Sequence, residues 1–124
     1  MKVREIMNKA YVIDDDLSLK EASKIMSKKN VGSLVVMKKG KLDGILTERD
    51  ILKNVGSSGK VKVAMSKNVI SIDPDASIDS AADMMAGHKI RRLPVVSKGK
   101  LIGIVTSTDL IANSDSLADS FLFD

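Results

Sequence analysis

Two threonine–aspartate pairs are the strongest candidates for a functional site in this sequence. Thr47 and Asp50 stand in the stretch Gly-Ile-Leu-Thr-Glu-Arg-Asp. Thr106 and Asp109 stand in the stretch Gly-Ile-Val-Thr-Ser-Thr-Asp, later in the chain. A threonine N-cap with an aspartate three residues on stabilises a helix by on the order of 1 kcal/mol. The same groups could instead hold a nucleotide, because a helix N-terminus favours an anion and an ionised carboxylate accepts ribose hydroxyls.

The predicted helices and strands that hold these pairs also occur twice in the chain. Each copy is predicted to be strand, helix, strand, strand, helix, so the chain is a tandem repeat of the α/β (α+β) class. A capping box at Ser18 and Glu21 begins the first long helix, and Ser77 begins its counterpart. Glycines at 40 and 99 mark the turns of two hairpins. The expected strands are 12–13, 33–37, 42–46, 69–70, 93–96 and 101–105, and the second helices are 48–54 and 107–113.

The repeat suggests the division of the chain. We expect a first repeat with lead-in and linker at 1–59, a second repeat at 60–113, and a tail at 114–124 that forms a short helix. A repeat of roughly 60 residues is short for an independent domain, so the two copies are expected to share one core.

Composition excludes several classes of protein. The chain is 44% hydrophobic and 29% charged, which is typical of a globular protein. It contains no cysteine, so disulfides and thiolate metal sites are excluded and a reducing, cytoplasmic setting is expected. No apolar run approaches the ~20 residues that a membrane span needs. The Asp14-Asp15-Asp16 run lacks the further ligands of a calcium loop, so we expect no metal.

Nucleic-acid binding and catalysis are both disfavoured. The formal net charge of +4 is modest, and the chain has only one tyrosine and two phenylalanines for base stacking. There is no cysteine nucleophile, no histidine paired with a carboxylate at a recognisable spacing, and no Walker-type phosphate loop. The single histidine, His88, is interpreted as a helix-end residue. We therefore expect a protein that is not an enzyme.

The repeated pattern resembles the CBS domain family, and the whole sequence is similar to a stand-alone CBS pair, also called a Bateman module. The two Thr-x-x-Asp stretches carry the resemblance, together with Val-Gly-Ser-Leu-Val-Val at 31–36 and Ile-Arg-Arg-Leu-Pro-Val-Val at 90–96. The resemblance implies two copies packed through their sheets about a pseudo-twofold axis. It also implies two clefts for adenosine-containing ligands such as AMP, ADP, ATP or S-adenosylmethionine, and a homodimer formed through helices.

The resemblance also implies roles for individual residues. Asp50 and Asp109 would hold ribose hydroxyls, and Thr47, Thr106 and Thr108 would contact ribose or phosphate. The residues implied to line the adenine pocket are Val12, Ile70 and Pro94.

The two copies differ where a ligand would be chosen. Arg91 and Arg92 of the second copy replace a glycine and a serine, and one of them would face a phosphate or simply be solvated. Arg49 could serve a phosphate in the first copy. We expect a regulatory sensor of adenine nucleotides that acts on an effector protein. The alternative is a scaffold or accessory subunit that contacts protein or nucleic acid without a nucleotide.

Overall fold

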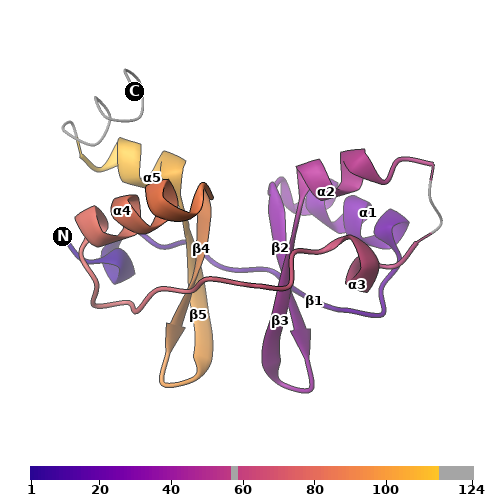
Figure 1. The fold of residues 1–124 in the computed structure, drawn as a ribbon, viewed down its shortest axis with the longest axis horizontal. Helices are drawn as coiled ribbons and strands as arrows, with labels where there is room; N and C mark the ends of the chain where they lie inside the picture. The colour runs from indigo at the N-terminus through magenta and orange to yellow at the C-terminus, as the bar shows by residue number, and fades with distance from the viewer. Residues whose placement is uncertain (57–58, 115–124) are drawn as a thin grey trace. The chain divides into compact units, whose positions relative to one another are not determined.

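The computed structural model describes residues 1–56 and 59–114, and the predicted tail helix lies outside the described residues. The chain divides into two compact units. The repeat-1 unit is Tyr11–Val69. The repeat-2 unit combines Met1–Ala10 with the chain from Ile70 onward. Each unit therefore consists of one repeat and the segment that precedes the other repeat (Figure 1). We call these segments lead-ins: residues 1–10 precede the first repeat, and residues 60–69 open the second.

The repeat-1 unit holds a three-stranded sheet in the order β1-β2-β3. Strand β1 runs parallel to β2, and β2 runs antiparallel to β3. Helices α1 and α2 follow β1 and β3, as the repeat pattern predicts (Figure 1). The bounds are β1 Val12–Asp14, α1 Leu19–Lys29, β2 Ser33–Lys38, β3 Lys41–Thr47, α2 Glu48–Lys53 and α3 Val61–Ala64.

The repeat-2 unit repeats this pattern with one strand reduced. Strands β4 and β5 form an antiparallel pair, and a single parallel bridge joins Ile72 to Val95 where the first repeat has β1. The bounds are η1 Val3–Glu5, α4 Ile78–His88, β4 Arg92–Ser97, β5 Lys100–Thr106 and α5 Ser107–Ala112. The predicted strand at 69–70 is wrong, because the pairing falls at Ile72.

One proline explains the shorter pairing in the repeat-2 unit. In the repeat-1 unit, Val35 of β2 donates its N–H to the Tyr11 carbonyl at 2.9 Å. Pro94 occupies the matching place in β4 and has no N–H, so the equivalent bond to Ile70 cannot form. Among the described residues, the pairing at this place consists of the bonds of Ile72, from its own N–H to the Pro94 carbonyl at 2.9 Å and from the Val96 N–H to its carbonyl at 3.0 Å.

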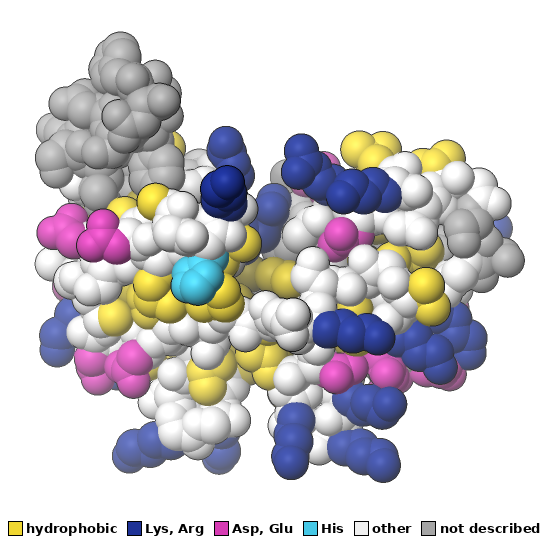
Figure 2. All heavy atoms as spheres, viewed as in Figure 1, with side chains coloured by type: hydrophobic (Ala, Val, Ile, Leu, Met, Phe, Trp, Pro, Cys, Tyr) yellow, Lys and Arg dark blue, Asp and Glu magenta, His cyan; other side chains and the backbone are white. Residues whose placement is uncertain are grey.

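The hairpin turns confirm the predicted role of the glycines. Lys39 and Gly40 have φ angles of 52° and 75°, and Lys98 and Gly99 have φ angles of 51° and 77°. Two successive positive φ angles form the tight turn that suits the right-handed twist of a hairpin. Lysines gather at the tips of both hairpins (Figure 2).

The predicted apolar helix faces pack into two separate cores. Ser18 caps α1 by accepting from the Glu21 N–H at 3.0 Å, and Ser77 caps α4 by accepting from the Ser80 N–H at 3.0 Å. The methionines Met26 and Met85 are buried in the two cores. Each unit has its own cluster of buried residues. The single core shared by the two copies stays a prediction from the repeat length.

The two lead-ins are exchanged between the repeats. Val3, ahead of the first repeat, donates its N–H to Ala76 at 2.9 Å, and Asn8 exchanges two backbone hydrogen bonds with Ile104 at 2.8 and 2.9 Å. Ser66, ahead of the second repeat, exchanges two with Ile45, both at 3.0 Å. The division at 1–59 and 60–113 remains a prediction about the sequence repeat.

Candidate functional site

Thr47 and Asp50 form a reciprocal capping box where β3 meets α2. The Thr47 backbone N–H and hydroxyl donate to Oδ2 of Asp50 at 2.8 and 3.0 Å. The Asp50 N–H donates back to the Thr47 hydroxyl at 3.4 Å. Thr47 has an extended backbone, with φ −116° and ψ 167°, which is the usual N-cap geometry. The predicted cap is therefore present.

Thr106 and Asp109 form the same box where β5 meets α5. The Thr106 N–H and hydroxyl donate to Oδ2 of Asp109 at 2.8 and 2.9 Å. The Asp109 N–H donates to the Thr106 hydroxyl at 3.3 Å. In both boxes these bonds end on Oδ2, so the cap engages one oxygen of each carboxylate. The other oxygen can accept hydrogen bonds from a hydroxyl of a ligand.

Glycines next to the boxes permit a close backbone approach. A Cβ at Gly44 would lie 2.5 Å from Sδ of Met65 and 2.8 Å from the Ser66 carbonyl oxygen. A Cβ at Gly103 would lie 2.8 Å from Sδ of Met7 and 2.9 Å from the Asn8 carbonyl oxygen. Each glycine therefore makes room for a lead-in that crosses the strand leading to a box.

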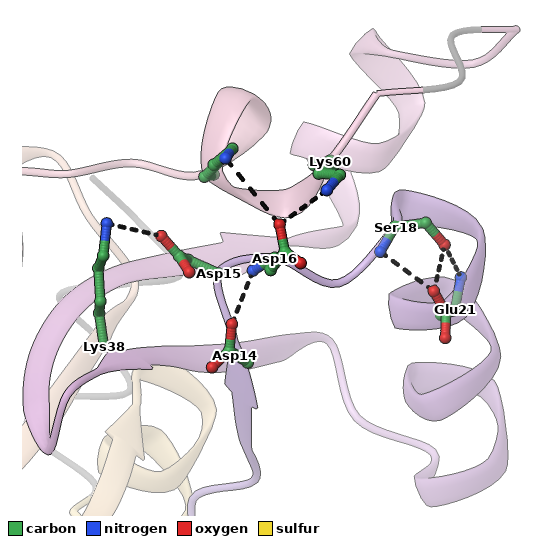
Figure 3. A network of polar contacts seen from close by, with 8 residues as sticks. Asp14, Asp15, Asp16, Ser18, Glu21, Lys38 and Lys60 are labelled. Atoms are coloured by element: carbon green, nitrogen blue, oxygen red, sulfur yellow. Dashed lines mark hydrogen bonds and ion pairs between the residues drawn. The ribbon is translucent and has the colours of Figure 1, made fainter.

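Ion pairs link the N-terminal end of each lead-in to the repeat that it contacts. Lys60 contacts Asp16 at 2.7 Å (Figure 3). Lys62 lies 4.0 Å from the same carboxylate. In the repeat-2 unit, Arg4 contacts Asp75 at 2.9 Å. The hydrogen bond from Lys60 lowers the pKa of Asp16, and that from Arg4 lowers the pKa of Asp75. Both aspartates are exposed, so solvent screens these pairs.

An asparagine that sequence reasoning missed contacts one of the boxes. The Asn8 side-chain amide donates to Oδ2 of Asp109 at 2.8 Å. Ser66 stands at the matching place of the other lead-in, and among the described residues no hydrogen bond joins it to Asp50. The repeated lead-in, Met-Asn-Lys against Met-Ser-Lys, was the available signal, but it does not show which box each lead-in meets.

The strand residue opposite each capping threonine differs between the units. Arg92 pairs with Thr106 across β4 and β5, whereas Ser33 pairs with Thr47 across β2 and β3. Directly opposed residues share one face of a sheet, so the side chains of Arg92 and Thr106 leave the backbone on the same face. The Arg91 carbonyl accepts the Ser107 N–H at 2.9 Å, and the Arg91 side chain is exposed.

The remaining predicted residues lie in varied settings. Arg49 and Thr108 are the exposed second residues of α2 and α5, and each directly precedes the aspartate of its box. Val12 is 51% exposed in β1, Ile70 packs against the core of the repeat-2 unit, and Pro94 is buried in β4. His88 is the exposed last residue of α4, as predicted.

The described residues contain no group of acidic, histidine and cysteine side chains that could hold a metal ion. Within the same residues, the helices are too short or too polar to cross a bilayer.

The sequence profile of the CBS domain family matches residues 3–57 and 60–115. The chain belongs to the CBS domain family. It carries two CBS domains in tandem, which confirms the predicted CBS pair and its β-α-β-β-α pattern.

Relatives of known sequence include small proteins and parts of enzymes. The CBS domain-containing protein YhcV of Bacillus subtilis (strain 168) is 37% identical over 109 residues, which are 84% of this chain and 78% of that protein. Inosine-5'-monophosphate dehydrogenase of Nitrosopumilus maritimus (strain SCM1) is 39% identical over 107 residues, 85% of this chain but 22% of the enzyme. The chain thus spans less than a quarter of that enzyme, and the similarity assigns it no catalytic role.

Solved structures of CBS pairs share the fold. The CBS domain pair of protein MJ0100, in complex with 5'-methylthioadenosine and S-adenosyl-L-methionine, has a TM-score of 0.85 and 33% identity. That match covers 91% of this chain and 94% of the other. CBSX2 in complex with AMP has a TM-score of 0.81 and 25% identity, and the match covers 94% and 98% of the two chains.

Proposed function

We propose that this CBS pair is a regulatory module that binds an adenosine-containing ligand at one or both Thr-x-x-Asp boxes. The observation that supports it most is the repeated box with one carboxylate oxygen outside the cap, in a family whose solved members include complexes with AMP and S-adenosyl-L-methionine. AMP, ADP, ATP and S-adenosylmethionine are the candidate ligands. Ligand binding would then shift the populations of conformations that an effector protein distinguishes.

The charges around the boxes suggest how the ligand divides its contacts. The carboxylates of Asp50 and Asp109 repel a phosphate and accept hydroxyls, so they suit the ribose. A phosphate would instead meet a guanidinium, that of Arg92 or Arg91 in the repeat-2 unit or of Arg49 in the repeat-1 unit. The apolar residues proposed for the adenine ring are Val12, Ile70 and Pro94.

We propose a homodimer in which helices make the contact. An open groove of about 430 Å³ lies on the repeat-1 unit between the end of α1 and the start of α2, with Met26, Ile51 and Leu52 among its lining residues. Leu52 is 71% exposed and the nearby Val55 is 75% exposed, an apolar area that a second copy would cover. Sedimentation of the native chain and of Leu52→Asp tests this, since the charged variant is expected to be monomeric.

The ligand is tested by thermal unfolding and calorimetry with AMP, ADP, ATP and S-adenosylmethionine. A ligand at ~100 times its dissociation constant adds ~2.7 kcal/mol to the free energy of unfolding when it binds only the folded state. We expect one of the four to stabilise the native chain and either Asp50→Ala or Asp109→Ala to abolish that gain. Asp79→Ala, which removes an exposed first-turn aspartate of α4 outside both boxes, is the matched control.

The scaffold alternative is supported by one observation, namely that both aspartates already serve as caps. It predicts no stabilisation by any of the four ligands, and variants that lose only the stability of a cap. That result would contradict the proposed function.

A further inference from the structure

We propose that Asn8 is a positioning residue that holds Asp109 for the ligand and makes the repeat-2 box the tighter and more hydroxyl-selective of the two. This inference rests on the proposed function. It adds a determinant of affinity and selectivity that lies in the lead-in, far from the box in sequence.

The geometry at Asp109 restrains the whole carboxylate. Oδ2 accepts three donors, namely the Thr106 N–H at 2.8 Å, the Thr106 hydroxyl at 2.9 Å and the Asn8 amide at 2.8 Å. The cap donors approach from the chain of the aspartate itself, and Asn8 approaches from a separate segment. Rotation of the side chain would break bonds on both sides, so Oδ1 keeps one orientation.

Asn8 is itself rigidly placed. Its backbone N–H and carbonyl both bond to Ile104, at 2.8 and 2.9 Å. The preceding residue, Met7, packs over Gly103, where a Cβ would come within 2.8 Å of its sulfur. A side chain of only two torsions on a fixed backbone loses little entropy when its amide donates.

The repeat-1 unit lacks this restraint. Ser66 has the same paired backbone bonds, to Ile45 at 3.0 Å each, but its hydroxyl is one atom closer to its backbone than the Asn8 amide nitrogen is. Among the described residues only Thr47 donates from a side chain to the Asp50 carboxylate. A ligand hydroxyl at Asp50 must therefore order a carboxylate that is freer than Asp109.

Two consequences follow for binding. Ordering one side chain on binding costs an amount that corresponds to roughly three- to tenfold in affinity, and Asn8 removes that cost at Asp109. A fixed acceptor also discriminates more strongly against a ligand that lacks the matching hydroxyl, since the acceptor is then left unpaired.

The experiment measures calorimetric affinities for AMP and 2'-deoxyadenosine 5'-monophosphate at each box separately. Asp50→Ala isolates the repeat-2 box and Asp109→Ala isolates the repeat-1 box, with Asp50→Asn and Asp109→Asn as cap-retaining substitutes should an alanine variant fail to fold. Asn8→Ser, which copies Ser66, and Asn8→Asp, which keeps the shape but removes the donor, are then added to each background. Unfolding of every variant without ligand reports any purely structural effect.

With the repeat-2 box isolated, we expect Asn8→Ser to weaken AMP binding about three- to tenfold and to reduce the preference for AMP over the deoxy analogue. Asn8→Asp should weaken it further through repulsion between carboxylates. In the repeat-1 background neither change should alter affinity. If the native chain binds AMP but Asn8→Ser leaves the affinity unchanged, or lowers it equally at both boxes, the role of Asn8 is overturned and the proposed function is not. Failure of the native chain to bind AMP would overturn this inference, and failure with all four ligands would overturn the proposed function as well.

Discussion

The two boxes share their internal geometry and differ in two of the side chains beside them. Thr47–Asp50 and Thr106–Asp109 make the same set of bonds, with lengths that agree within 0.1 Å. The neighbours of the second box include Asn8 and Arg92, where the first has Ser66 and Ser33. The capping box satisfies free backbone N–H groups at the start of each helix, so both copies contain it. The surrounding positions carry no such requirement and can distinguish the ligands of the two boxes.

Substitution of the glycine that each lead-in crosses is expected to have the largest effect on stability. We expect Gly44→Ala to destabilise the protein by about 1–3 kcal/mol, because the new Cβ meets the Ser66 backbone, which cannot move like a side chain. Gly103→Ala should cost less, since its closest contacts are slightly longer. Urea unfolding measures both, with Gly87→Ala as the control. Gly87 lies in α4 with open space around it, so an alanine there should stabilise by up to about 1 kcal/mol.

Exchanging the residues at one strand position tests the cause of the shorter pairing in the repeat-2 unit. Val35→Pro removes the N–H that bonds Tyr11 and should cost about 1–2 kcal/mol. Pro94→Val restores a donor opposite Ile70 and should slow amide exchange around Ile72 at little change in stability. Hydrogen exchange followed residue by residue measures both. Unaltered exchange at Tyr11–Asp14 in Val35→Pro would show that the proline does not set the strand length.

Removing each carboxylate measures how much Asn8 adds to the second cap. Asp50→Ala should cost about 1 kcal/mol, as the loss of a cap does. Asp109→Ala should cost about 0.5–1.5 kcal/mol more, because it also loses the bond from Asn8. A double-mutant cycle with Asn8→Ala isolates the pairwise free energy. Equal costs for the two aspartates would contradict a contribution from Asn8.

The smallest effect concerns the ion pairs of the lead-ins and their response to pH. The pKa values of Asp16 and Asp75 are lowered from 3.8 in the folded protein, so their contribution is present above that pH and is lost as pH falls through the folded pKa values. Asp75→Asn should therefore be less stable than the native chain at pH 7, and the gap should close in acid. Melting temperatures from pH 7 to pH 2 measure it. Added salt should narrow the same gap at pH 7.

Local patterns in the sequence predicted most of the fold. The capping boxes, the hairpin turns and the helix faces each depend on residues a few positions apart, whose geometry is set by the backbone. The strand predicted at 69–70 is misplaced because an apolar pair alone does not fix the register: Ile72 pairs with Val95 just as Ile13 pairs with Val36, and the missing donor at Pro94 shortens that pairing. Sequence alone could not place Asn8 beside Asp109, since that contact requires knowing which strand each lead-in crosses.

Parts of the candidate site remain predictions for a physical reason. The roles of Thr108, Arg49 and Arg91 depend on a phosphate, and their exposed side chains adopt an orientation that a bound anion would decide. The packing of the two copies through their sheets about a pseudo-twofold axis is likewise a prediction from family resemblance.

The exchange of lead-ins bears on how such a chain could have arisen. In this chain, each lead-in crosses the glycine-containing strand of the other repeat. A protein with a single repeat that folded in the same way would leave both its lead-in and its glycine-containing strand without a partner. Two such proteins could supply these contacts by exchanging their lead-ins in a dimer, whose formation depends on protein concentration. Duplication and fusion of the gene would make the exchange of lead-ins intramolecular. A short connection between the repeats then gives each lead-in a high effective concentration at its strand. The sequences of the two repeats could then diverge, because each repeat would always have the lead-in of the other in the same chain.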